Sequence, residues 1–413
     1  MEKEKAIISG INFTKNWENS IKELEGLAEA DDITVMGICT QSLEKPNNAT
    51  YIGKGKVQEL KEMVSNMEAN LVIFNNELSG IQLRNLEDII GVKIIDRTIL
   101  ILDIFARRAK SKNGKLQVEL AQQKYRLSRL TGFGNSLSRQ GGGVGTRGPG
   151  EKKIETDRRH IERRIDDIKD EINKAAIVRN TQRKLREKSN IPVVALVGYT
   201  NAGKSALMNA VLMEVNKEFK NVFEEDMLFA TLDTYQRSIK YDKNEFILTD
   251  TVGFVSELPH TLVDAFKGTL EEVLYADLLL HVIDISNPEC EFQEKVTNKV
   301  LGEMGALEKD IVKVYNKIDL LPYEIDEKEG EDKIYISAKK AINLEAVKDI
   351  ILKKLFDNKI KTTLLIPYDR GDIVSYLCDK YLLEKMDYTD NGTLLIVKLE
   401  IDDYRRLNKY EAL

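Results

Sequence analysis

The sequence has few cysteines and histidines and no long hydrophobic run. Its three cysteines are far apart and form no CxxC pair, so we expect neither a structural zinc site nor disulfide bonds. This cysteine usage is typical of a protein in a reducing compartment. Three histidines argue against histidine-based metal or acid–base chemistry. No apolar stretch reaches the roughly 18 residues of a membrane helix, and the charged start MEKEKAIISG has no signal-peptide core. We therefore expect a soluble, cytoplasmic protein without membrane association.

Charge is abundant and nearly balanced. The chain has 62 Lys and Arg against 68 Asp and Glu, a net charge of −6, and 42% hydrophobic residues. This composition excludes a generally basic nucleic-acid coat protein and argues against a disordered chain. With 413 residues, the chain is long enough for two to four domains.

Positive charge is concentrated in one segment. Between Arg107 and Arg164 there are 16 Lys or Arg but only five Asp or Glu, and residues 132–150 hold eight of the 25 glycines. Such a segment could be a solvated hairpin, but glycines let backbone amides approach phosphates, which favours RNA binding. The candidate RNA-contacting residues are Arg139, Arg147, Lys152 and Lys153.

Hydrophobic patterns divide the chain into four segments, and the overall class is α/β. Residues 1–106 alternate short β-branched runs with helical patterns, which predicts a small parallel α/β domain. Apolar residues at helical spacing over residues 107–190 predict a long helical hairpin whose two helices are joined by a glycine-rich loop at 132–150. Residues 191–358 again alternate, and predict a doubly wound sheet. Residues 359–413 predict a small α/β domain with two strands flanking a helix over VSYLCDKYLLEKM.

The strongest motif is GYTNAGKS, which matches GxxxxGK[ST] and follows the strand-like run VVALV. Its glycines let backbone N–H groups approach phosphate oxygens. Lys204 would place its charge on the β- and γ-phosphates, and the Ser205 hydroxyl can ligate Mg²⁺. The motif predicts a nucleotide site formed by Gly198, Tyr199, Thr200, Asn201, Ala202, Gly203, Lys204 and Ser205.

Two further segments suit the γ-phosphate and the metal ion. Asp250 ends the strand-like run FILTD and begins DTVG; its carboxylate fits Mg²⁺, and the Gly253 amide can bind the γ-phosphate. Thr231 lies where a GTPase has a switch threonine that ligates Mg²⁺, although it could be an ordinary loop threonine. The residues predicted to line this part of the site are Phe229, Ala230, Thr231, Leu232, Asp233, Asp250, Thr251, Val252 and Gly253.

The motif NKID selects the base. The carboxylate of Asp319 can accept two hydrogen bonds from guanine, and adenine lacks that pair of donors. SAK follows the next strand-like run and can close over guanine. The predicted base-binding residues are Asn316, Lys317, Ile318, Asp319, Ser337, Ala338 and Lys339. The order of the four motifs, each at a strand end, predicts a GTPase with GTP or GDP and Mg²⁺ as ligands.

Hydrolysis is expected to depend on Lys204, Thr231 and Gly253, and to be slow without a partner. Phe254 stands where Ras-like enzymes carry a glutamine that orients water, and a phenyl ring cannot do so. Asn201 could assist a monovalent cation such as K⁺, or it could cap its own loop.

Together these residues resemble the HflX family of ribosome-associated GTPases. The similar stretches include YIGKGKVQEL, VIFNNELSGIQLRNLE, RTILILDIFARRAKSKNGKLQVELAQ and GGGVGTRGPGEKKIETDRRHIERRI. The sequence departs from the family at TLDTYQR, where the family has TLDPTTR, and at GKSAL, where it has GKSTL. Thr231 is kept, so the resemblance still implies Mg²⁺ binding.

The resemblance implies a monomer with an N-terminal HflX domain, a helical linker, a GTPase domain and a short C-terminal domain. It also implies binding to the large (50S) ribosomal subunit, with the glycine-rich loop near the peptidyl-transferase centre, and splitting or rescue of stalled ribosomes. The alternatives are a paralogue that confers antibiotic resistance and an RNA-remodelling protein whose nucleotide pocket is secondary and also takes ATP. A membrane-associated signalling GTPase is disfavoured because no lipidation signal is evident.

Overall fold

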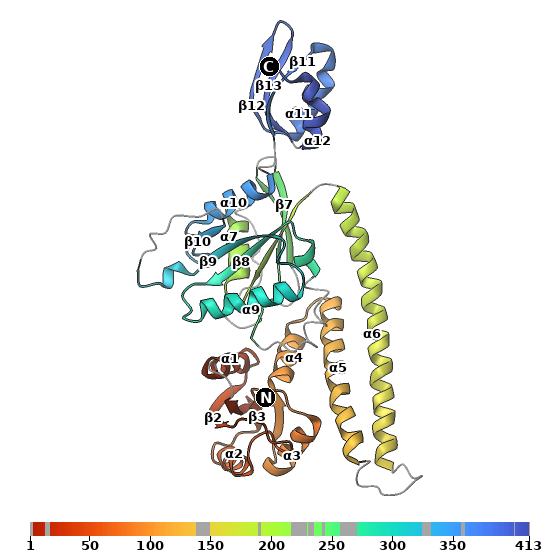
Figure 1. The fold of residues 1–413 in the computed structure, drawn as a ribbon, viewed down its shortest axis with the longest axis vertical. Helices are drawn as coiled ribbons and strands as arrows, with labels where there is room; N and C mark the ends of the chain where they lie inside the picture. The colour runs from red at the N-terminus through yellow and green to blue at the C-terminus, as the bar shows by residue number, and fades with distance from the viewer. Residues whose placement is uncertain are drawn as a thin grey trace.

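The computed structural model contains three β-sheets and a pair of long helices (Figure 1). An N-terminal domain, a central sheet and a C-terminal domain follow one another along the longest axis, and the long helices lie beside the first two. The structure describes residues 3–12, 17–137, 149–188, 191–215, 229, 235–241, 244–256, 271–323, 332–356, 360–399 and 401–412.

The N-terminal domain is a four-stranded parallel sheet in the order β2-β1-β3-β4, which confirms the predicted α/β unit. Its strands are β1 (Lys5–Asn12), β2 (Thr34–Ser42), β3 (Leu71–Phe74) and β4 (Lys93–Asp96), and its helices are α1 (Trp17–Ala30), α2 (Lys54–Asn66), α3 (Gly80–Ile90) and α4 (Arg97–Arg108). Successive strand residues face opposite sides, so Ile7 packs with α2 and α3 whereas Ile8 packs with α1 and α4. The sheet is therefore covered on both faces.

Two helices, α5 (Lys112–Leu137) and α6 (Pro149–Lys188), form an antiparallel pair that we call the helical arm. Leu116 and Leu120 of α5 pack against Ile165 and Ile168 of α6, which confirms the predicted apolar seam. Ion pairs flank the seam, and Arg164 donates two hydrogen bonds to the Glu119 carboxylate at 2.7 and 2.9 Å. The pairing fixes the register of the two helices.

The helices extend further than we expected at the far end of the arm. Residues 132–137 belong to the predicted glycine-rich loop, but α5 continues through Leu137, and α6 already begins at Pro149. Once a helix has formed, each added residue gains a hydrogen bond, and this gain can outweigh the cost of a glycine. The rest of the predicted loop, including Arg139 and Arg147, lies outside the described residues.

The central sheet has six strands in the order β10-β9-β8-β5-β7-β6. They are β5 (Val193–Gly198), β6 (Tyr235–Tyr241), β7 (Asn244–Asp250), β8 (Leu278–Asp284), β9 (Asp310–Asn316) and β10 (Lys333–Tyr335). Only β6 is antiparallel to its neighbour. Helices α7 (Lys204–Val215) and α10 (Leu344–Phe356) cover one face and α9 (Cys290–Glu303) the other, which confirms the doubly wound sheet.

The C-terminal domain is an antiparallel sheet in the order β11-β13-β12, packed against two helices. Its elements are β11 (Ile360–Ile366), α11 (Gly371–Lys380), β12 (Leu383–Thr389), β13 (Gly392–Leu399) and α12 (Ile401–Leu407). The predicted helix over VSYLCDKYLLEKM is wrong in its last part. The helix ends at Lys380, and the residues that follow pair with β13 as a strand, because neighbouring strands override helical spacing.

The N-terminal domain and the central sheet share one continuous core. Phe105 of α4 meets Phe229 edge to face, with ring centroids 4.5 Å apart. Val300 and Leu301 of α9 belong to the same cluster of buried side chains. Among the described helices, none is both long and apolar enough to cross a membrane.

Candidate nucleotide-binding site

The predicted motif residues meet at one edge of the central sheet. Strands β5, β7, β8, β9 and β10 are parallel, so their carboxyl ends lie side by side. Gly198, Asp250, Asp284 and Asn316 are the last residues of four of these strands. Ligands of open α/β sheets bind at this edge.

The loop between β5 and α7 depends on two glycines in the left-handed region. A Cβ on Gly198, at φ +151°, would lie 2.2 Å from the Val282 carbonyl oxygen, and one on Gly203, at φ +90°, would lie 2.2 Å from Asn316 Nδ2. No larger residue fits at either position. The loop therefore passes close to β8 and β9, as a phosphate-binding loop must.

Lys204 is buried, and its ammonium has no carboxylate at hydrogen-bond distance. Its Nζ donates to the carbonyl oxygens of Tyr199, at 2.8 Å, and Gly198, at 3.2 Å. Burial lowers the pKa of Lys204 to about 8, and the charge of Asp250 acts in the opposite direction. A buried cation of this kind is stabilised by a bound anion such as a phosphate.

Asp250 and Ser205 form a pair beside Lys204. The Ser205 hydroxyl donates to Asp250 Oδ2 at 2.6 Å, whereas Oδ1 is buried and has no partner among the described residues. Burial raises the pKa of Asp250, while Lys204 and the Ser205 hydrogen bond lower it. A buried carboxylate oxygen without a partner, next to a hydroxyl, fits an oxygen-ligated divalent cation such as Mg²⁺.

Asn316 connects the base-binding loops to the phosphate-binding loop. Its Nδ2 donates to the Ala202 carbonyl oxygen at 2.9 Å, and its Oδ1 accepts the Ala338 amide at 3.0 Å. Ser337 donates to Asp319 Oδ1 at 2.6 Å and so orients that carboxylate. Lys317 pairs with Asp284 at 2.7 Å, Ile318 is half-buried, and Lys339 is exposed.

The DTVG segment lies directly on the phosphate-binding loop. The Thr200 amide donates to the Phe254 carbonyl oxygen at 2.7 Å, and the Phe254 amide donates to the Gly198 carbonyl oxygen at 3.1 Å. The Phe254 side chain is 2% exposed and packs in the shared core, so it cannot orient water. Thr251 donates to the Leu196 carbonyl oxygen at 2.6 Å and anchors the start of the segment. Val252 is buried as well.

Some predicted site residues are not placed. Phe229 is buried, and its amide donates to Thr200 Oγ1 at 2.8 Å, but Ala230, Thr231, Leu232 and Asp233 lie outside the described residues. Lys152 and Lys153 lie in the first turns of α6, far along the arm from the central sheet (Figure 1).

Two features of this site escaped prediction from the sequence. Asp284 pairs with Lys317, and the Tyr199 side chain points away from the phosphate-binding loop, where its hydroxyl donates to Glu23 of the N-terminal domain. Glu23 also contacts Arg97 and Ser256. Glu23, Arg97 and Ser256 are scattered over the sequence and stand in none of the nucleotide-binding motifs, so only the fold reveals their contact with Tyr199.

Family models match three consecutive parts of the chain. They are described as GTP-binding GTPase N-terminal (residues 18–106), GTP-binding GTPase Middle Region (residues 108–186) and 50S ribosome-binding GTPase (residues 193–317). GTPase HflX of Caldanaerobacter subterraneus is 49% identical over 99% of this chain and 94% of its own length. The chain belongs to the HflX family of GTPases.

A more distant relative carries the same family name. GTPase HflX of Escherichia coli is 38% identical over 99% of this chain and 96% of its own length. A crystal structure of a GTP-binding protein from Sulfolobus solfataricus in complex with GDP covers 86% of this chain and 99% of its own, at 26% identity and a TM-score of 0.46. As an HflX GTPase, the chain binds guanine nucleotides and hydrolyses GTP.

Proposed function

We propose that this HflX GTPase binds the large ribosomal subunit in its GTP-bound state and leaves it after hydrolysis, so that it splits or rescues stalled ribosomes. The observation that carries the proposal is the meeting of the phosphate-binding and base-binding loops at one sheet edge, in a chain that also bears a long basic arm. The matched model of residues 193–317 is described as a 50S ribosome-binding GTPase, which supports the choice of partner.

The arm suits a distant RNA target. Helix α6 has 40 residues, which corresponds to about 60 Å. The arm is attached firmly to the N-terminal domain, because Arg129 of α5 pairs with the fully buried Asp96 of that domain. In our proposal, the basic glycine-rich segment at its far end contacts ribosomal RNA near the peptidyl-transferase centre, with Arg139, Arg147, Lys152 and Lys153 on phosphates.

The nucleotide site supplies the switch. We assign Mg²⁺ to Ser205, Asp250 and Thr231, the γ-phosphate to Lys204 and Gly253, and the base to Asp319, all within one GTPase domain over residues 191–358. A bound Mg²⁺ would neutralise phosphate charge during hydrolysis. With Phe254 buried, the residue that orients water has to come from elsewhere, so hydrolysis is slow until the ribosome binds. We keep K⁺ as a further cation near Asn201, and a monomer as the active form.

The test is co-sedimentation of the full chain with purified large subunits in the presence of GMPPNP, GDP or no nucleotide. We expect strong association with GMPPNP only, and its loss in Lys204→Ala and Ser205→Asn. Equal sedimentation under all three conditions would overturn the proposal. If deletion of residues 132–150 abolishes nucleotide binding as well as ribosome stimulation, the loop has no separate role.

Salt dependence separates specific phosphate contacts from general attraction. Replacement of the four candidate cations by Gln should reduce the slope of log ribosome affinity against log salt concentration. The reduction should correspond to the loss of up to about four phosphate contacts. A matched variant that neutralises exposed lysines of the N-terminal domain, Lys54 and Lys61, should leave this slope unchanged. GTPase rates in K⁺ and Na⁺, with and without large subunits, test the cation assignment in the same preparation.

A further inference from the structure

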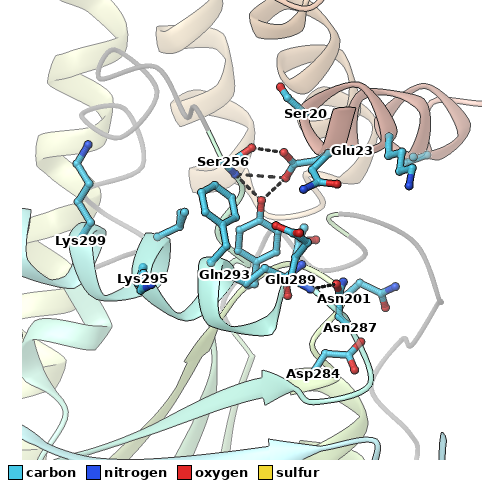
Figure 2. A pocket seen from close by; sticks show the side chains of 18 of the residues that line it. Ser20, Glu23, Asn201, Ser256, Asp284, Asn287, Glu289, Gln293, Lys295 and Lys299 are labelled. Carbon is cyan, nitrogen blue, oxygen red and sulfur yellow. Dashed lines mark hydrogen bonds between the residues drawn. The ribbon is translucent and has the colours of Figure 1, made fainter. Parts of the chain in front are cut away.

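A carboxylate of the N-terminal domain contacts residues of the two loops that border the nucleotide site. Glu23 lies on α1, and its side chain is 11% exposed. It accepts hydrogen bonds from the hydroxyl groups of Tyr199 and Ser256, and from the Ser256 amide at 3.2 Å (Figure 2). The Ser256 amide also donates to the Tyr199 hydroxyl oxygen at 2.7 Å. We call Glu23, Arg97, Tyr199 and Ser256 the interdomain clasp.

Arg97 fixes the clasp within the N-terminal domain. Its side chain is 3% exposed and pairs with Glu23. Its Nη1 donates to Asn75 Oδ1 at 2.9 Å and to Ser20 Oγ at 3.0 Å, and its Nη2 donates to Ser256 Oγ at 3.2 Å. Glu23 therefore keeps a compensated charge, while the hydroxyl and amide donors come from the GTPase domain.

The two GTPase-domain members belong to the two loops that meet the phosphates. Tyr199 directly follows Gly198 in the phosphate-binding loop, and Ser256 lies three residues after Gly253. The paired backbone of Tyr199 and Phe254 joins these loops between the two clasp contacts. A movement of Gly253 is therefore expected to displace Ser256 and to strain its hydrogen bonds to Glu23.

Gly253 has little space in this arrangement. A Cβ on Gly253 would lie 2.6 Å from Thr200 Cα and 2.9 Å from Lys204 Nζ. These distances place Gly253 directly against the Lys204 ammonium, and a γ-phosphate has to contact both Lys204 and the Gly253 amide. Separation of the two groups is therefore a demand of GTP, because GDP has no γ-phosphate.

We propose that Glu23 is a positioning residue through which the N-terminal domain lowers the preference of the site for GTP over GDP. The clasp holds the segment after Gly253 on the phosphate-binding loop, and the γ-phosphate works against it. By linkage, GTP loosens the N-terminal domain from the GTPase domain by the same factor by which the clasp weakens GTP binding. A cavity of about 760 Å³ between α1 and α9 borders Glu23, Tyr199 and Ser256 and gives the clasp space to open (Figure 2).

The test measures the ratio of GMPPNP affinity to GDP affinity by calorimetry. Loss of one hydrogen bond to a carboxylate changes an equilibrium by about tenfold to 100-fold. We expect Tyr199→Phe and Ser256→Ala each to raise the ratio by about tenfold or more, and Glu23→Gln to raise it at least as much. GDP affinity should stay within about twofold in Ser256→Ala and Glu23→Gln. Tyr199→Phe removes only a hydroxyl and leaves Glu23 paired with Arg97, so it remains informative even if the Glu23 variant folds poorly.

Ser20→Ala is the matched control, because it removes a hydroxyl that contacts Arg97 but neither Tyr199 nor Ser256. The ratio of GMPPNP affinity to GDP affinity in Ser20→Ala should equal that of the wild type. In the wild type, GMPPNP should also speed hydrogen exchange in α1 relative to GDP. Unchanged or lowered ratios in folded Tyr199→Phe and Ser256→Ala would overturn the proposal. This inference concerns the nucleotide site alone, so failure of ribosome binding would leave it standing.

Discussion

Asp96 and Asp250 occupy similar places in two different sheets. Each is the last residue of a parallel strand, β4 in the N-terminal domain and β7 in the GTPase domain, and each is fully buried. Asp96 is completely paired: Oδ1 accepts the Ile99 amide at 3.0 Å, and Oδ2 accepts the Leu78 amide at 3.1 Å together with Tyr125 and Arg129. Its charge is used to hold the helical arm.

Among the described residues, Asp250 Oδ2 accepts from Ser205 while the buried Oδ1 has no partner, and Lys204 next to it donates to the carbonyl oxygens of Tyr199 and Gly198. The two sheets have the same type of architecture, yet within the part of the chain that the structure describes both carboxylate oxygens of Asp96 are paired, whereas Oδ1 of Asp250 is not. Buried polar groups are normally satisfied, so such a deficit marks the place of a ligand. The difference between a structural aspartate and a binding aspartate thus lies in the neighbours that the fold supplies.

The largest expected effect comes from Lys204→Ala. The variant removes the cation that faces the phosphates, so GTP affinity should fall by at least about 100-fold, as calorimetry would show. Without nucleotide, the same variant should be more stable than the wild type by about 1–3 kcal/mol, because a buried charge with a lowered pKa is removed. If Lys204→Ala is less stable than the wild type without nucleotide, the contrast between the two sheet edges is wrong.

The stability that Lys204→Ala gains without nucleotide should depend on pH. In the unfolded chain, lysine keeps its proton up to a pKa near 10.5, whereas folded Lys204 releases it near pH 8. Between these values the unfolded state binds more protons, so wild-type stability rises with pH and approaches that of the variant. Below pH 8 the variant should keep its whole stability advantage over the wild type, and this advantage should no longer change with pH. Urea unfolding of both proteins at pH 7, 8.5 and 10 measures this convergence.

Asp96→Asn should affect a different property, the stability of the N-terminal domain. The change leaves the nearly buried Arg129 without its counter-charge, and we expect the N-terminal domain to lose about 3–5 kcal/mol. Trp17, the single tryptophan, lies in α1 and reports this transition by fluorescence. Asp88→Asn makes the same change at an exposed carboxylate and should cost less than about 0.5 kcal/mol. Equal losses would remove the distinction that we draw.

Tyr125→Phe should have the mildest effect. It removes one donor to Asp96 and one acceptor for Arg129, while those two residues keep each other. We expect a loss of about 1–2 kcal/mol in the same fluorescence assay, with GDP affinity unchanged. A loss as large as that of Asp96→Asn would mean that packing of the ring, and not charge pairing, holds the arm to the domain.

The nucleotide site was largely predictable because each part is encoded locally. GYTNAGKS, DTVG, NKID and SAK each follow a strand-like run, and parallel strands bring their ends together. The residue types also reveal the backbone conformation that the loop requires, because Gly198 and Gly203 lie where a Cβ would collide with β8 or β9. These constraints act over a few residues, so a single sequence displays them.

The remainder was not predictable because it depends on distant partners. Glu23 and Ser256 are 233 positions apart, and neither stands in a recognisable motif. Strand β12 was taken for the end of a helix because LEKM suits either structure, and only pairing with β13 decides. Residues 132–137 were assigned to a loop on their glycine content, although they continue α5.

The attachment of α5 to Asp96 lies toward the far end of this helix. Arg129 is the eighteenth of its 26 residues, so only about 12 Å of α5 extends beyond the attachment. A turn of the N-terminal domain relative to the central sheet must therefore carry the far end of the arm with it. A movement barely visible beside the nucleotide could therefore make or break contacts at the remote end.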